Sequence, residues 1–177
     1  MAKPVVVSIH IASAAKAMPT EVNKAHAVPG KGLEGDRYFN QAGTFSKHPG
    51  GDNELTLIEI EAIDALRAEC KVEIKLGEAR RNIVTRGVAL NHLVGREFKI
   101  GQVSFRGIRL CEPCSHLEAL TKPGVKSGLV HRGGLRAEVL TEGTIQAGDP
   151  VIEAERSRVP EPASEIMALH DKASGAS

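Results

Sequence analysis

The pattern of apolar and polar positions predicts a chain made mostly of β-strands. Residues 5–13 are rich in β-branched residues, follow Pro4 and predict a strand. After residue 70, short alternating runs punctuated by glycine lie at 73–76, 82–85, 97–100, 102–110, 136–140 and 149–154. Short strands at regular spacing with few helices predict a mainly β fold, a closed or partly closed β-barrel with a few short helices.

Two segments depart from this β pattern. Residues 54–69 predict a helix, because Thr56 and Glu59 have the spacing of a capping box and apolar residues recur at helical spacing. That apolar stripe consists of Leu57, Ile60, Ala62, Ile63 and Leu66. Residues 115–124 predict a short helix that ends at Pro123 and Gly124. Between the first strand and these helices, residues 28–53 carry six glycines and two prolines and predict a long loop, which in a compact domain tends to be functional.

The length of 177 residues fits one domain with a tail. We expect a barrel domain over residues 1–152 and a C-terminal arm over 153–177, partly disordered, with one helix near 163–172. The N-terminal apolar run is interrupted by His10 and Lys16, so it indicates a strand rather than a signal peptide.

Composition narrows the classes of partner. Lys and Arg number 23 against 22 Asp and Glu, and this near-neutral charge predicts no strong attraction to nucleic acid or to a membrane surface. Aromatic residues make up only 3% of the chain, which argues against a stacking platform for single-stranded nucleic acid. Three cysteines cannot all pair within one chain, so we expect a reducing, cytoplasmic setting.

The segment RLCEPCSHLEAL (109–120) carries the most distinctive chemistry. Cys111 and Cys114 suggest a zinc site, with His116 and either His131 or His92 as further ligands, but the second paired half of a zinc knuckle is missing. A redox dithiol is a second interpretation, although the β-α-β context of such motifs is absent. Buried packing of both cysteines is a third.

A single reactive thiol fits this segment better. Cys114 directly precedes the short predicted helix, and the backbone N–H groups at a helix N-terminus favour a thiolate. Cys111 lies on the strand side of the turn. The residues alone leave it either a resolving thiol or a strand residue.

Basic and polar residues form further candidate groups. Arg80, Arg81, Asn82, Thr85 and Arg86 lie close together, as do His131, Arg132 and Arg136 around a Gly-Gly pair. Arginine offers a planar fork of donors suited to phosphate and carboxylate. Side chains alternate between the faces of a strand, so these groups do not all point at one ligand. Asp36 and Arg37 follow a glycine-flanked turn, whose glycine spacing fits neither a P-loop nor a dinucleotide loop.

Taken together, these motifs resemble the MOSC family, the domain at the C-terminus of molybdenum cofactor sulfurases. The matching segments run in order from about residue 28 to 152: GLEGDR (32–37), RRNIVTRGVALNHLVGREFKIGQV (80–103), RLCEPCSHLEAL and GLVHRGGLRAEVLTEGTIQAGDPV (128–151). Several spaced motifs in order agree by chance far less often than one short match. The resemblance implies a barrel of the MOSC or PK β-barrel type, and Cys114 is the position that fits the family's cysteine.

The resemblance also implies a function. Cys114 would carry a persulfide sulfur or ligate molybdenum. The groups that would bind the pterin end of the molybdenum cofactor (molybdopterin) or shape its site are Arg80, Arg81, Asn82, Thr85, Asp36, Arg37, His131 and Arg132. Some relatives reduce N-hydroxylated compounds. We expect a MOSC domain alone, without the pyridoxal-phosphate desulfurase domain, so a separate desulfurase or electron-transfer protein would be the partner. A non-catalytic module that binds a small anionic metabolite or a partner enzyme is the alternative, and a structural zinc domain is a third.

Overall fold

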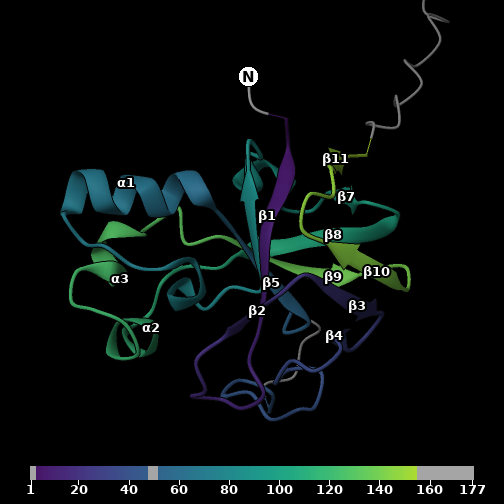
Figure 1. The fold of residues 1–177 in the computed structure, drawn as a ribbon, viewed down its shortest axis with the longest axis horizontal. Coiled ribbons are helices and arrows are strands. Elements are labelled where there is room, and N and C mark those ends of the chain that lie inside the picture. Colours follow the sequence, from purple (N-terminus) through teal and green to yellow (C-terminus); the bar gives the residue numbers. More distant parts are fainter. Residues whose placement is uncertain (1–2, 48–51, 155–177) are drawn as a thin grey trace, which may run out of the picture.

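A curled sheet of eight strands dominates the computed structural model, which describes residues 3–47 and 52–154 (Figure 1). In spatial order its strands are β11 (Val151–Glu153), β7 (Glu97–Ile100), β8 (Val103–Leu110), β9 (Leu135–Val139), β5 (Leu55–Glu59), β6 (Ile83–Arg86), β1 (Val5–Ile11) and β2 (Thr20–Val22). A smaller sheet contains β10 (Gly143–Gln146), β3 (Lys24–Val28) and β4 (Gly32–Leu33). The predicted mainly β fold with a partly closed barrel is confirmed.

The helices gather at one side of this sheet (Figure 1). They are α1 (Ile60–Cys70), α2 (Ser115–Ala119) and α3 (Val125–Gly128), and two 3₁₀ turns, η1 (Leu76–Ala79) and η2 (Leu90–Leu93), complete the set in the described residues. Helix α1 connects β5 to β6, which pair in parallel, whereas the other paired strands run antiparallel. The fold therefore contains one β-α-β crossover beside its barrel-like sheet.

Two hydrophobic clusters hold these layers together. Leu57 of β5 and Ile83 of β6 belong to the cluster inside the curled sheet, whereas Ile58 and Val84 belong to a second cluster with Leu66 of α1. Strands β5 and β6 are thus buried on both faces, as parallel strands under a helix are. The site described below lies at one end of these two strands.

Burial on both faces also explains the main error in the predicted elements. Residues 55–59 form β5 instead of the first turns of a helix, and α1 begins at Ile60. The predicted capping box is wrong, because the Thr56 hydroxyl contacts the Asn82 side chain and Glu59 makes no side-chain cap bond. A strand with apolar residues on both faces lacks the period of two that would distinguish it from a helix.

The other elements agree in part with their predictions. The strands expected at 5–13, 82–85, 97–100, 102–110, 136–140 and 149–154 are present, as is the helix at 115. Residues 73–76, predicted as a strand, have no regular structure up to Leu76, where η1 begins. Strands β2, β3 and β10 were not predicted, and β4 lies within the segment predicted as a long loop. The arm from 155 onward, with its predicted helix, lies outside the described residues.

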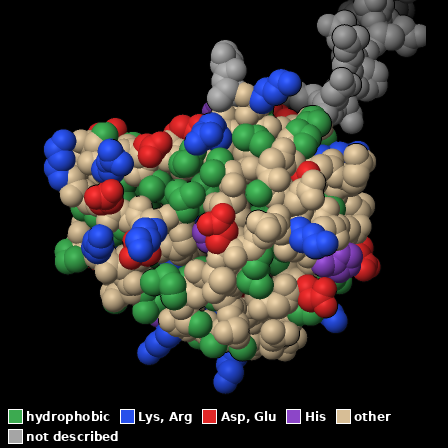
Figure 2. Space-filling view, in the orientation of Figure 1, with side chains coloured by type: hydrophobic (Ala, Val, Ile, Leu, Met, Phe, Trp, Pro, Cys, Tyr) green, Lys and Arg blue, Asp and Glu red, His purple; other side chains and the backbone are tan. Residues whose placement is uncertain are grey.

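Surface charge is mixed, in keeping with a net charge of +1. Figure 2 shows basic and acidic side chains interspersed over the region of α1. Among the helices of the described residues, none combines the length and the apolar character needed to span a bilayer.

Candidate functional site

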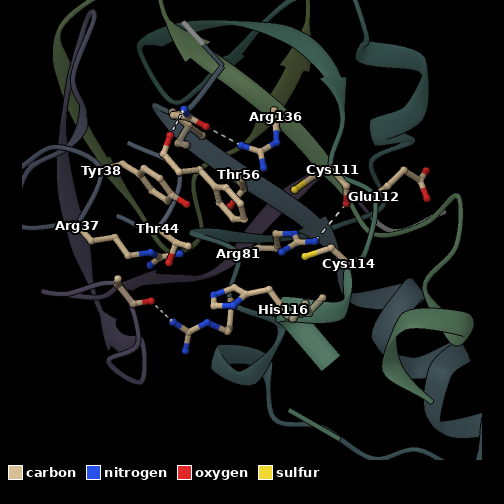
Figure 3. A pocket seen from close by; sticks show the side chains of 16 residues that line it. Arg37, Tyr38, Thr44, Thr56, Arg81, Cys111, Glu112, Cys114, His116 and Arg136 are labelled. Carbon is tan, nitrogen blue, oxygen red and sulfur yellow. Dashed lines mark hydrogen bonds between the residues drawn. The ribbon is translucent and has the colours of Figure 1, made fainter. Parts of the chain in front are cut away.

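A cavity opens where three segments far apart in the sequence meet (Figure 3). The loop after β8 contributes Cys111 and Cys114, the segment between η1 and β6 contributes Arg80 and Arg81, and the loop before β5 contributes Arg37. The volume, including the open mouth, is about 620 Å³.

The two cysteines of this loop have different access to solvent. Cys114 is exposed and caps α2 in an extended conformation, with φ −131° and ψ 168°. Cys111 is buried at 4% exposure. Both are free thiols, and both side chains line the cavity. Cys114 is therefore the thiol that a reagent or partner in solution reaches first.

Positive charge dominates the wall. Arg37, Arg80, Arg81 and Arg136 line the cavity, and Glu112 is the one carboxylate among its described lining residues. Burial and then the charge of Arg37 hold the pKa of Arg80 below its usual value. A cluster of desolvated like charges is stabilised when an anion binds between them.

Two of these arginines keep donor capacity for a ligand. Arg80 donates from Nη2 to the Ala15 carbonyl at 3.1 Å. Arg136 donates from Nη1 to the Asn53 side chain at 2.9 Å, but its buried Nε finds no hydrogen-bond partner among the described residues. Buried donors are nearly always paired in native proteins, so this nitrogen is a group that a ligand or ordered water would satisfy.

Arg81 has a different task. Its Nε donates to the Gly133 carbonyl at 2.9 Å, its Nη2 to the Cys111 carbonyl at 3.1 Å and its Nη1 to the Ala79 carbonyl at 3.4 Å. It ties the cysteine loop to the Gly133–Gly134 turn. A Cβ on Gly133 would lie 2.5 Å from the Cys111 carbonyl oxygen, so the loop packs directly on that glycine.

Three of the predicted site residues brace the walls from behind. Asn82 accepts from the Thr56 N–H at 3.0 Å and donates to the His10 carbonyl at 3.2 Å, and it joins β5 to β1. Thr85 is fully buried against the Ile58 carbonyl. The Asp36 carboxylate is also fully buried, accepts from the Ala12 and Tyr38 N–H groups and lies 3.5 Å from Arg37 Nη1. None of the three lines the cavity, and their role in binding stays a prediction.

Two more predicted residues do not line the cavity. The His131 side chain is 84% exposed, and Glu112 accepts from its backbone N–H at 3.0 Å. Arg132 pairs with Glu69 of α1 at 2.7 Å, and this pairing raises the pKa of Arg132 and lowers that of Glu69. His131 is therefore in contact with the cavity lining through Glu112, and Arg132 is bound to α1.

The structure adds residues that the set of predicted site residues lacked. Arg136, Tyr38, Glu112 and His116 all line the cavity. In the sequence, Arg136 was noted as a basic residue and His116 as a candidate zinc ligand, and neither was among the predicted site residues. Tyr38 is the single tyrosine of the chain and directly follows Asp36-Arg37, a signal that could have led to it. No group of three His, Cys, Asp or Glu side chains that could hold a metal ion exists in the described residues, which disfavours the zinc interpretation.

Comparisons with known proteins agree with this architecture. The family model of the MOSC domain matches residues 44–152. The crystal structure of the YuaD protein from Bacillus subtilis is similar at a TM-score of 0.68 and 17% identity, over 84% of this chain and 94% of that one. The chain is also similar to YiiM from Geobacillus stearothermophilus (TM-score 0.65, 16% identity, 86% and 76% of the two chains). YiiM from Escherichia coli is similar at a TM-score of 0.60 and 17% identity, over 86% of this chain and 70% of that one. At these identities the likeness establishes the fold alone. No curated protein sequence matches.

Proposed function

The chain belongs to the MOSC domain family, and we propose that it is a sulfur carrier in which Cys114 holds a persulfide sulfur beside an anionic acceptor bound by arginines. The observation that carries this proposal is that one accessible thiol and four arginines line the same cavity. A thiolate is the soft nucleophile that sulfur chemistry needs, and arginine forks bind phosphate.

The loading step needs a second protein. A persulfide on a desulfurase, itself a pyridoxal-phosphate enzyme, would be attacked at its outer sulfur by the Cys114 thiolate. A new S–S bond forms on Cys114, and the donor leaves as a thiolate. The exposure of Cys114 at the cap of α2 supports access by a partner of this size. A reducing compartment such as the cytoplasm would keep Cys114 available as a free thiol.

The residues present also fit the molybdenum cofactor as the anionic ligand. The unpaired Arg136 Nε and the desolvated Arg80 suit a phosphate-bearing group, and Cys114 offers one thiolate ligand. When bound, that cofactor would supply redox chemistry such as the reduction of N-hydroxylated compounds, with an electron-transfer protein as partner.

Mass spectrometry tests the carrier function. The protein is treated with inorganic polysulfide, freed of excess reagent and analysed at once. We expect one added sulfur on the peptide with Cys114 and none on the same peptide of the Cys114→Ser variant. Elemental analysis of the purified protein measures molybdenum in parallel. A Cys114 that neither takes up sulfur nor reacts with an alkylating reagent at neutral pH, in protein without molybdenum, would contradict the proposal. Retention of full biological activity by Cys114→Ser would favour the alternative, a non-catalytic anion-binding module.

A further inference from the structure

Cys111 is a buried residue that also lines the cavity. At 4% exposure it belongs to neither of the two hydrophobic clusters among the described residues. Its side chain lines the cavity together with that of Cys114 (Figure 3). Cys111 is thus a buried thiol that borders the same cavity as the exposed Cys114.

The backbone of Cys111 is fixed on both sides. Its N–H donates to the Gly134 carbonyl at 2.7 Å, and its carbonyl accepts from Arg81 Nη2 at 3.1 Å. Next to it, a Cβ on Gly133 would also come within 2.9 Å of the Pro113 ring, so no larger residue fits under the Cys-Glu-Pro-Cys segment. These contacts fix the backbone of Cys111 at the cavity wall.

The two thiols therefore differ in access while sharing one cavity. A donor protein reaches Cys114, which is exposed, but not Cys111, which is buried. A sulfur bound to Cys114 lies in the same cavity as Cys111, and the two residues are three positions apart in the chain. An intramolecular thiol competes strongly with thiols in solution, because its effective concentration is high.

We propose that Cys111 is the resolving thiol that releases the sulfur from Cys114 as sulfide, an inference that rests on the proposed sulfur-carrier function. The Cys111 thiol gives up its proton to water, and its thiolate attacks Sγ of Cys114. The bond between the two sulfurs of the persulfide breaks, and hydrosulfide leaves with the electron pair. A Cys111–Cys114 disulfide forms, so Cys111 is oxidised as the outgoing sulfur is reduced. A dithiol reductant then restores both thiols.

Release inside the cavity has a functional consequence. Sulfide would appear next to the arginines that hold the acceptor and not at the protein surface. The exposed Cys114 would thus be loaded with sulfur, and the buried Cys111 would release it.

The test uses the polysulfide-loaded full chain and its Cys111→Ser and Cys111→Ala variants, with Cys70→Ser as the matched control on the third cysteine. After removal of excess polysulfide, free sulfide and the disulfide-linked peptide 111–114 are measured over time without added thiol. We expect the wild type and Cys70→Ser to release sulfide and to form the Cys111–Cys114 disulfide in equal amounts. Both Cys111 variants should keep the persulfide until dithiothreitol is added.

The outcomes separate this inference from the proposed function. Sulfide release from both Cys111 variants at the wild-type rate, or a loaded wild type that forms no Cys111–Cys114 disulfide, would overturn the resolving role while leaving Cys114 a sulfur carrier. Failure of Cys114 to take up sulfur would overturn both. Thermal unfolding of the two variants shows whether either substitution disturbs the fold, and two variants of different size keep the test independent of packing.

Discussion

Two walls of the cavity use their polar groups in opposite ways. On the wall formed by residues 80–85, Arg81, Asn82 and Thr85 direct their side chains at backbone carbonyls and N–H groups of other segments. On the wall formed by residues 111–116, Cys114 is exposed, and Glu112 makes its contact with His131 at the rim. The hydrogen bonds of the first wall stabilise the fold, whereas the second wall leaves the Cys114 thiol accessible to solvent.

This difference shows that a dense polar motif is not by itself a ligand site. Segment 80–85 looks like the binding motif in the sequence, yet only Arg80 and Arg81 of its polar residues reach the cavity. Arg81 serves the second wall, because it fixes the Cys111 and Gly133 carbonyls. Removing the side chain of Arg81, Asn82 or Thr85 should therefore change stability, whereas removing that of Arg80 should change binding.

The largest expected effect is that of Arg81→Met. Three backbone carbonyls lose a charged donor, and hydrogen bonds to charged groups contribute about 1.5–3 kcal/mol each, so we expect the free energy of unfolding to fall by at least about 3 kcal/mol. Urea unfolding measures it. Arg67→Met is the matched control, since the Arg67 side chain is 71% exposed on α1 and should change stability by less than about 0.5 kcal/mol. Equal effects of the two substitutions would show that Arg81 is not a clamp.

A smaller loss is expected for Asn82→Ala. The Thr56 N–H and the His10 carbonyl would lose their side-chain partner in a buried place, which costs about 2 kcal/mol or more of unfolding free energy. Asn91→Ala provides the comparison, because Asn91 also donates to a carbonyl, that of His131, but is exposed. If Asn82→Ala changed the alkylation rate of Cys114 and left the free energy of unfolding unchanged, the assignment of a structural role to Asn82 would be wrong.

The fold was largely predictable from the sequence, because alternating strands such as 97–100 and 102–110 have one face in the core and one in solvent. The start of α1 could not be predicted, because β5 is buried on both faces and lacks the alternation of apolar and polar residues that marks a strand. Strand β2 is three residues long with two of them exposed, so it carries almost no pattern. Its pairing with β1 depends on tertiary contacts that a local pattern does not contain.

The candidate site was predictable in its residue types and less so in its geometry. Cys114, Arg37, Arg80 and Arg81 were predicted and do line one cavity. Which donors are already occupied depends on carbonyls far away in sequence, such as that of Gly133, 52 residues from Arg81. The unpaired Arg136 Nε likewise follows from burial in the folded state, which residue type does not specify.

Arg80→Met should affect binding while leaving the fold intact. We expect the dissociation constant for inorganic pyrophosphate to rise about tenfold or more, because one charge-assisted contact of about 1.5–3 kcal/mol is lost. The lowered pKa of Arg80 shows that its charge is held at a cost, so its removal should not reduce stability much. Isothermal calorimetry measures the affinity, and Arg106→Met, outside the cavity and paired with Glu97, is the control. Unchanged affinity with reduced stability would place Arg80 with Arg81 as a clamp.

The smallest expected effect is a pH dependence of stability from His10, whose carbonyl Asn82 holds. Burial lowers the pKa of His10 below 6.5, against a smaller raising effect of Glu21. The unfolded chain then binds a proton that the folded chain does not, so stability is fully present above pH 6.5 and is lost as the pH falls below it. Glu54 and Glu59 act with the opposite sign, because burial raises their pKa above 4.5 and their contribution is lost as the pH rises.

The His10 contribution is therefore measured as a difference. Urea unfolding of the wild type and of His10→Gln between about pH 7 and about pH 5 should show a steeper loss toward acid in the wild type, since this interval contains the ordinary titration of histidine. Glutamine keeps a donor for the Ser8 hydroxyl, which lies 2.9 Å from His10 Nε2. The exposed His92, changed to Gln, controls for the loss of any histidine. If the free energy of unfolding depended on pH in the same way in the wild type and in His10→Gln, His10 would not contribute to the loss of stability in acid.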